Sequence, residues 1–271
     1  MTACFERVHV RTVLIHHDDS ALDRDVVAPW LGSFSELAGV VVVREPRSNR
    51  LARIRREVRR SGLVRLFDVL AFRLYYQLRF ASRDRSWEAR ERAQLSRRYP
   101  RVRGDVPELI TPDPNIREAE RFIRDCRPDL VVARSRVLLD EQVFSIPPLG
   151  TFVMHPGITP EYRNSHGCFW ALANRDLARV GLTLLLIDQG VDTGAVFGYF
   201  TYAYDELRES HEVIQKRMLL ENLDALRDRL LEVERGEAAT IDTSGRASAA
   251  WGQPWLTKYA RWKRAARKTE R

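Results

Sequence analysis

Short apolar runs alternate along the chain with segments whose apolar positions recur every three or four residues. The runs predict buried strands at 8–16, 37–43, 129–133, 150–154 and 180–187, with a strand and turn at VPELITPDPN. The helical spacing predicts helices at 23–37, 116–126, 169–174 and 209–234. Strands and helices that alternate in this way build α/β folds. We therefore predict a Rossmann-like, doubly wound α/β fold with a mostly parallel sheet.

One region departs from this alternation. Seven arginines and one acid lie within 47–60, and the apolar stretch Leu63–Phe80 that follows contains Arg65, Asp68 and Arg73. We expect an α/β domain at 1–235 with a helical, arginine-rich insert at about 47–100, followed by a short basic tail at 236–271. The apolar stretch fits a helix packed on the sheet, an interface with a second copy, or a basic amphipathic helix on an anionic membrane.

Composition limits the class of protein. The 271 residues carry a formal net charge of +8, with 44% hydrophobic and 30% charged residues, which fits a globular chain with a negatively charged partner. Cys4, Cys126 and Cys168 are scattered, which argues against a disulfide framework or a structural zinc site and for a reducing, cytoplasmic compartment. Charged residues interrupt the N-terminal apolar run, so we expect neither a signal peptide nor a membrane span there.

Two polar residues follow predicted strands and suggest chemistry. His155 ends the strand at 150–154, and Asp192 follows the strand at 180–187 within DQGVDTG. Because ligands bind beyond the carboxyl ends of strands in open α/β sheets, we expect both residues at one functional edge. A histidine oriented by a carboxylate supports acid–base work on an acyl carbon. Each residue alone also fits an ordinary packing or turn role.

Four motifs in order strengthen this interpretation. They read PDLVVARSRVLL, IPPLGTFVMHPGITPEYR, FWALANRD and VGLTLLLIDQGVDTG. Together they resemble the folate-dependent formyltransferases, a family that includes glycinamide ribonucleotide, methionyl-tRNA and sugar N-formyltransferases. The resemblance places His155 and Asp192 at the family's catalytic histidine and aspartate. It implies an N-formyltransferase with 10-formyltetrahydrofolate as co-substrate.

The catalytic asparagine of the family has no counterpart at the matching position. Val153 stands two residues before the histidine, and valine cannot donate a hydrogen bond to an oxyanion. Asn164 and His166 follow in the loop, so we predict that one of them supplies the missing donor, with Asn164 preferred. The competing interpretations are a turn residue for Asn164, an exposed residue beside a helix for His166, and a changed reaction.

The resemblance also implies a pterin slot. Its walls would be the loop Arg134, Ser135, Arg136, Val137 and Leu138 and the turn Gln189, Gly190 and Val191. Arg134 and Arg136 give this slot an unusual composition. An acceptor amine would attack the formyl carbon, His155 would support the tetrahedral intermediate, and Asp192 would hold His155 and relay the proton.

The acceptor is predicted to be an amine of a small molecule, such as an amino sugar, including an anionic nucleotide-sugar. Little aromatic interleaving near the arginines argues against nucleic acid. A peripheral membrane contact and a homodimer stay open. Two other functions also stay open, a formyl-folate hydrolase and a catalytically silent ligand-binding relative.

Overall fold

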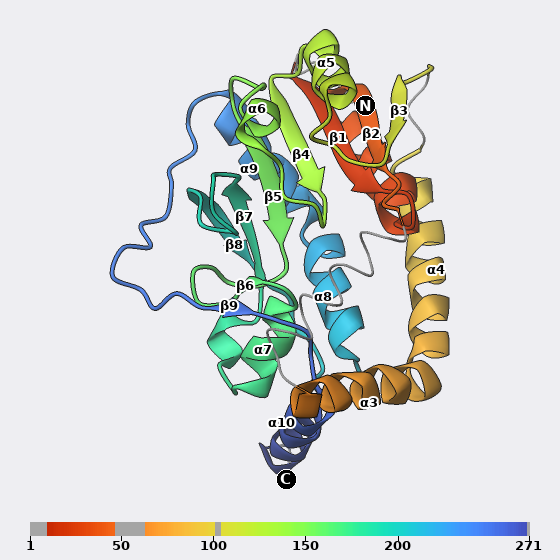
Figure 1. Cartoon of the computed structure of the whole chain (residues 1–271), viewed down its shortest axis with the longest axis vertical. Helices are drawn as coiled ribbons and strands as arrows, with labels where there is room; N and C mark the ends of the chain where they lie inside the picture. The colour runs from red at the N-terminus through yellow and green to blue at the C-terminus, as the bar shows by residue number, and fades with distance from the viewer. Residues whose placement is uncertain (1–9, 47–62, 101–103, 270–271) are drawn as a thin grey trace, which may run out of the picture.

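The computed structural model describes residues 10–46, 63–100 and 104–269, and these contain a seven-stranded sheet with the order β3-β2-β1-β4-β5-β7-β8 (Figure 1). The strands are β1 (Arg11–His17), β2 (Glu36–Val43), β3 (Glu108–Thr111), β4 (Leu130–Arg134), β5 (Thr151–His155), β7 (Leu182–Leu186) and β8 (Val196–Phe200). Strands β1 to β5 pair in parallel, whereas β7 pairs antiparallel with both β5 and β8. The predicted α/β fold with a mostly parallel sheet is confirmed.

Both faces of the sheet are covered, which explains why its strands are apolar at successive positions. On one face, Val13 and Ile15 of β1 pack in a core with Ile123 of helix α5 (Arg117–Cys126), and helix α6 (Glu141–Phe144) lies on this side too. On the other face, Leu14 joins a larger core that includes Phe152. Side chains alternate across a strand, so one run of sequence supplies both cores.

Helical segments close the larger core. They include η1 (Asp23–Val27), α1 (Ala28–Gly32), α7 (Gly167–Ala173), α8 (His211–Leu220) and α9 (Leu223–Glu234). The helix predicted at 23–37 ends at Gly32, because the chain turns there to enter β2 at Glu36.

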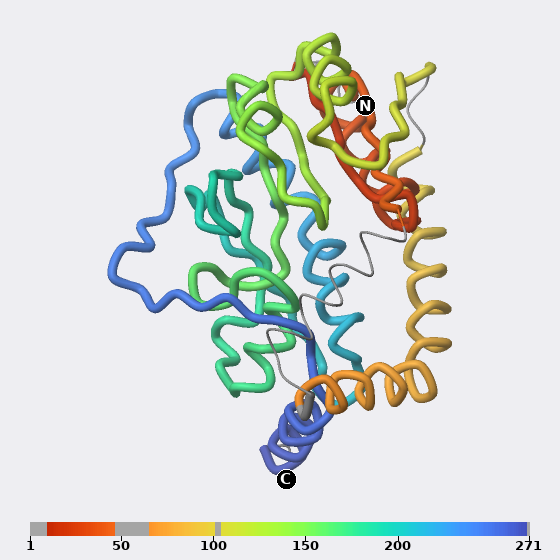
Figure 2. Tube along the Cα trace, in the orientation of Figure 1, coloured from red at the N-terminus to blue at the C-terminus, as the bar shows by residue number. Residues whose placement is uncertain are grey.

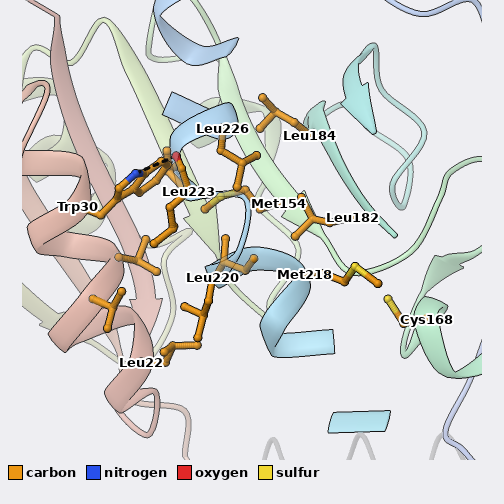
Figure 3. Packing of buried hydrophobic residues seen from close by; sticks show 14 of the residues in the cluster. Leu22, Trp30, Met154, Cys168, Leu182, Leu184, Met218, Leu220, Leu223 and Leu226 are labelled. Carbon is orange, nitrogen blue, oxygen red and sulfur yellow. Dashed lines mark hydrogen bonds between the residues drawn. The ribbon is translucent and has the colours of Figure 1, made fainter. Parts of the chain in front are cut away.

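The prediction of one continuous helix over 209–234 is wrong. The chain breaks at Glu221 and Asn222 between α8 and α9, and the Asn222 side chain donates to the Met218 and Thr201 carbonyls. Trp30 Nε1 donates to the Leu223 carbonyl at 3.1 Å, which holds the corner against α1 (Figure 3). The apolar spacing continues across this break, so periodicity does not reveal it.

Helices α3 (Leu63–Arg79) and α10 (Leu256–Thr269) lie at the end of the molecule to which β1, β4 and β5 point (Figure 1). Helix α3 packs against α4 (Ala81–Arg98) and against the C-terminal helix α10. The arginine cluster expected at 47–60 lies outside the described residues. None of the described helices is long and apolar enough to cross a membrane.

The segment after α9 returns across the molecule before it forms α10 (Figure 2). Its strand β9 (Ala250–Trp251) pairs with β6 (Arg163–Asn164) in a separate two-stranded sheet. Trp251 stacks on Trp170 with ring centroids 4.7 Å apart. The tail therefore packs against the loop that follows β5.

Candidate active site

His155 and Asp192 meet at the end of β5. His155 Nδ1 lies 3.3 Å from Asp192 Oδ2, and His155 Nε2 forms a 2.7 Å hydrogen bond with the Tyr162 carbonyl. A carbonyl only accepts, so Nε2 donates this bond, and Nδ1 hydrogen-bonds the Asp192 carboxylate when the ring carries a second proton there. The His155 residue is 3% exposed. Both of its nitrogens therefore have protein partners, and the ring is held in a fixed orientation.

The sequence argument placed Asp192 at this edge for a reason that the topology does not support. Because β7 runs antiparallel to β5, the carboxyl end of β7 lies beside Phe152, at the other end of β5 from His155. Asp192 reaches His155 because the loop between β7 and β8 turns back. Arg163 donates to the Val191 carbonyl at 2.8 Å and the Asn164 N–H donates to Asp192 Oδ2 at 2.7 Å, which fixes this return.

Two glycines allow the loop after β5 to close around His155. A Cβ atom on Gly157 would lie 2.5 Å from the Tyr162 carbonyl oxygen and 2.9 Å from His155 Nε2. A Cβ atom on Gly167 would lie 2.6 Å from the Gly157 Cα. Thr183 ties the same loop to β7, because its hydroxyl donates to the Gly157 carbonyl at 2.6 Å. Any larger side chain at either glycine would displace the histidine's hydrogen-bond partner.

The predicted pterin slot is divided between two cavities. Ser135, Val137 and Leu138 line a cavity of about 90 Å³ together with Gln189 and Gly190. Val153 and Asp192 line the same cavity. Val191 does not line this cavity, and its carbonyl accepts from Arg163. This smaller cavity is thus lined by most of the residues assigned to the slot and by Asp192 of the histidine–aspartate pair.

Arg134 and Arg136 line a second cavity, of about 360 Å³. Arg134 Nε donates to Asp23 at 2.7 Å, and Arg136 pairs with Asp19 at 2.5 Å. The loop after β4 thus gives its arginines to one cavity, and Ser135, Val137 and Leu138 to the other. The arginines therefore do not enter the slot, which accounts for its apparently unusual composition.

Asn164 contributes to the candidate active site through its backbone N–H. Its side-chain amide donates to the Trp251 carbonyl in β9, while its N–H binds Asp192. Its φ of 73° lies in the left-handed region, which asparagine tolerates better than most residues. The structure thus gives the amide a partner in the tail.

His166 lies in a different group, which the sequence did not indicate. Its Nδ1 lies 3.8 Å from Glu212 Oε1, and the same oxygen lies 3.3 Å from His211 Nε2. Burial lowers the pKa of His166 to about 4. Burial also raises the pKa of Glu212, but the hydrogen bond and charge of His211 outweigh it and the net pKa is lowered. The pair His211–Glu212 begins a helix in the sequence, but nothing in its spacing points to His166.

Solved structures of formyltransferases share this fold. Phosphoribosylglycinamide formyltransferase from Anaplasma phagocytophilum superposes with a TM-score of 0.54 over 91% of this chain and 100% of that chain, at 12% identity. A 4-N formyltransferase from Francisella tularensis gives 0.53 over 95% of this chain and 87% of that chain, at 10% identity. The chain therefore has the fold of these formyltransferases.

Sequence comparison gives the same class. Methionyl-tRNA formyltransferase from Thermotoga maritima is 28% identical over 137 residues, which cover 48% of this chain and 44% of the relative. The Synechococcus sp. enzyme of the same name is 31% identical over 140 residues, 51% of this chain and 42% of the relative. The matches span less than half of these relatives, and no family model matches the chain. Over about half of its length the chain is thus a distant relative of formyltransferases.

Proposed function

We propose that this protein transfers a formyl group from 10-formyltetrahydrofolate to an amine of a small molecule. One observation carries the proposal: the histidine–aspartate pair lies between two cavities. Val153 and Asp192 line the smaller cavity, while Met154 and Pro156, the neighbours of His155, line the larger one. A group transfer needs a donor and an acceptor on either side of the reacting carbon, and this arrangement offers a place for each.

The smaller cavity is the proposed donor side. Ser135 and Gln189 offer polar groups beside apolar walls from Val137 and Leu138, a combination that suits a flat heteroaromatic ring. At about 90 Å³ the cavity is smaller than the roughly 300–1,000 Å³ of most ligand pockets, so the loops at 134–138 and 188–192 must separate for the pterin to enter. The folate supplies the formyl group, and these loops hold it.

The larger cavity is the proposed acceptor side. Its volume of about 360 Å³ matches a small-molecule ligand. Lys216 pairs with Glu88 at 2.7 Å, and Arg134 and Arg136 have aspartate partners as described above. Paired charges of both signs favour an acceptor with a cationic amine and polar substituents, such as an amino sugar. A nucleotide-sugar would need one of these pairs to open.

Asp192 is the proposed proton acceptor. The amine nitrogen forms a bond to the formyl carbon, the bond from that carbon to the folate nitrogen breaks, and the folate nitrogen gains a proton as the amine loses one. The Asp192 side chain is 15% exposed and lines the donor cavity, whereas the His155 side chain is 4% exposed. Asp192 can therefore meet the reacting atoms and relay the proton, and His155 holds Asp192 in place and supports the charge that develops.

Isotope transfer tests this function. The protein is incubated with 10-formyltetrahydrofolate labelled in the formyl carbon and with a panel of amino sugars and nucleotide-linked amino sugars, and mass spectrometry locates the label. We expect one amine to gain a labelled formamide while tetrahydrofolate forms in equal amount. Labelled formate without any formamide would assign the chain as a formyl-folate hydrolase.

A second candidate function is ligand binding without turnover. Two observations favour it: Val153 offers no donor to an oxyanion, and both nitrogens of His155 already have protein partners. It predicts that 10-formyltetrahydrofolate raises the unfolding temperature while the label stays on the folate with every acceptor and with water. Substitution of His155 would then change stability but not a chemical rate.

A further inference from the structure

A group of metal-binding side chains lies outside the proposed active site. His166 begins α7, His211 and Glu212 begin α8, and one donor atom from each lies within 4.8 Å of the other two. All three line a cavity of about 280 Å³ that is separate from the two described above. We propose that this triad binds a divalent transition metal, with Zn²⁺ as the best match.

The donor distances are close to those of a zinc site. Bonds of about 2.0–2.1 Å in tetrahedral geometry place neighbouring donor atoms about 3.3 Å apart. Glu212 Oε1 lies 3.3 Å from His211 Nε2 and 3.8 Å from His166 Nδ1. A small rotation of the His166 side chain would bring all three donors to bonding distance. Two imidazoles and one carboxylate also form a donor set that zinc enzymes use.

Burial and unmet hydrogen bonds support the assignment. His211 is 3% exposed, and its ring is packed against those of Phe72, Tyr76 and Phe169, which fixes its orientation. Among the described residues, His166 Nδ1, the proposed donor atom of that side chain, is buried without a hydrogen-bond partner. Buried polar atoms are normally paired, so the cluster keeps bonding capacity that the protein itself does not use.

The open side of the triad faces the cavity. Arg73, Gln77 and Gln253 contribute polar groups to its walls. Three protein ligands that leave a fourth position toward a cavity are typical of catalytic rather than structural zinc. The fourth position would hold a water molecule or an anionic group of a ligand, and Arg73 favours the anion. The scattered cysteines, which argued against zinc, have no part in this donor set.

Cobalt substitution tests the metal site without reference to activity. Untagged protein is treated with a chelator, and Zn²⁺ binding is then measured by titration calorimetry and Co²⁺ binding by visible absorption. We expect one equivalent of Zn²⁺ and cobalt bands of a tetrahedral or five-coordinate site. Glu212→Gln and His166→Asn should each weaken binding at least about tenfold, because each removes a ligand.

Glu221→Gln is the matched control, since it makes the same substitution at the exposed end of α8 and should keep the affinity of the wild-type chain. Circular dichroism of the metal-free variants shows whether they fold. No Zn²⁺ binding by the folded wild-type chain would overturn the proposal. So would equal affinity in folded Glu212→Gln and Glu221→Gln.

A second inference rests on the exposed face of α3. Phe67, Leu70, Leu74 and Leu78 are 69%, 46%, 62% and 81% exposed, and their spacing places them within one stripe of the helix. Val69 and Phe72 on the opposite side are buried in the protein. Four exposed large apolar residues in one stripe mark an interaction surface rather than ordinary scatter.

We infer that this stripe docks on an anionic membrane surface. Arg65, Arg73 and Arg79 are exposed on the same helix, and its single acid, Asp68, binds the N–H of Thr257. These arginines lie away from the stripe, where Arg65 stacks over the Trp255 ring and Arg73 donates to Gln253. The helix thus combines an exposed apolar face with a net positive charge, which suits a layer of acidic headgroups above acyl chains. A two-fold interface through the stripe would instead bring like-charged helices together. Charge therefore favours the membrane over a second copy.

Vesicle sedimentation tests the surface. We expect the chain to sediment with phosphatidylcholine vesicles that contain phosphatidylserine, to stay in solution with phosphatidylcholine alone, and to be released by salt. The double variant Phe67→Ser with Leu78→Ser should lose this binding. Ile110→Ser with Ile241→Ser, which replaces two exposed residues elsewhere, should keep it. Failure to sediment with either vesicle would overturn the inference, as would self-association in light scattering that the Phe67→Ser, Leu78→Ser variant abolishes.

Discussion

At the scale of single residues, the candidate site depends on backbone groups as much as on side chains. The Tyr162 carbonyl holds His155, and the Asn164 N–H holds Asp192. Backbone partners cannot be identified from residue types, so the sequence pointed to the asparagine side chain in this loop. The geometry instead suggests that the conformation of residue 164 matters because it directs an N–H at a carboxylate.

Replacement of Asn164 by glycine separates these two roles. Glycine adopts the φ of 73° without strain and keeps the N–H, but it removes the amide that donates to Trp251. We expect Asn164→Gly to keep formyl transfer within about threefold of the wild-type rate. The measurement is single-turnover transfer at saturating folate. A tenfold loss or more, which corresponds to about 1.4 kcal/mol of barrier, would restore the side chain as the oxyanion donor.

At the scale of elements, the sequence predicted where strands and helices lie better than it predicted how they connect. The β-branched runs identified β2 and β4, because residues buried on both faces of a parallel sheet are apolar throughout. The same property hid the direction of β7, since an entirely apolar run such as VGLTLLLI reads alike in a parallel and an antiparallel strand. The corner between α8 and α9 was hidden because both helices bury leucines at compatible spacing.

The C-terminal tail, which the sequence identified only as basic, packs against the loop around His155. Trp251 stacks on Trp170 and on Tyr162, whose carbonyl binds His155. We expect Trp251→Ala to lower the free energy of unfolding by about 2 kcal/mol, because it removes a large, partly buried aromatic side chain. It should also slow formyl transfer more than it weakens folate binding. Chemical denaturation and transfer kinetics check both effects, and unchanged stability would show that the tail does not brace the loop.

Helix α10 carries a buried cation with a measurable signature. Lys263 is 7% exposed, and its Nζ donates to the Glu209 carbonyl at 2.9 Å and lies 4.1 Å from the Trp262 ring centroid. Burial lowers the pKa of Lys263 from 10.5 to about 8, while Glu206 and Asp205 raise it and Arg83 and Arg267 lower it further. Between these two pKa values the unfolded chain holds a proton that the folded chain has lost.

Stability should therefore rise with pH above about 8, because unfolding takes up a proton in this interval. The gain in stability from pH 8 to 10.5 amounts to about 3 kcal/mol for the whole difference between the two pKa values. Below pH 8 none of this gain is present, because both states are protonated. Urea unfolding at several pH values between about 7.5 and 9.5 measures the slope. Lys263→Met should flatten it. An equal slope in the variant would assign the pH dependence to other groups.

At the scale of the whole molecule, the fold gathers residues that the sequence keeps apart. His155 was predictable because it ends an apolar run, and Asp192 because DQGVDTG resembles a family motif, although the strand before it runs antiparallel to β5. His166 and His211 were not predictable as a pair, since they are 45 residues apart and meet only where α7 and α8 pack together. The loop 134–138 is divided between two cavities, and the second of these was not predictable because α8 and η1 form part of its lining.

The central claim is that Asp192, held by His155, carries the proton during transfer of a formyl group from 10-formyltetrahydrofolate to an amine. The most direct measurement compares labelled-formyl transfer by the wild-type chain, Asp192→Asn and the exposed control Asp242→Asn at equal folate saturation. Asparagine keeps the shape of aspartate but cannot take a proton. The account predicts transfer by the wild-type and control chains and a loss of about 100-fold or more in Asp192→Asn, with folate affinity unchanged. Transfer by Asp192→Asn at the wild-type rate, or folate binding by the wild-type chain without transfer to any amine, would contradict it.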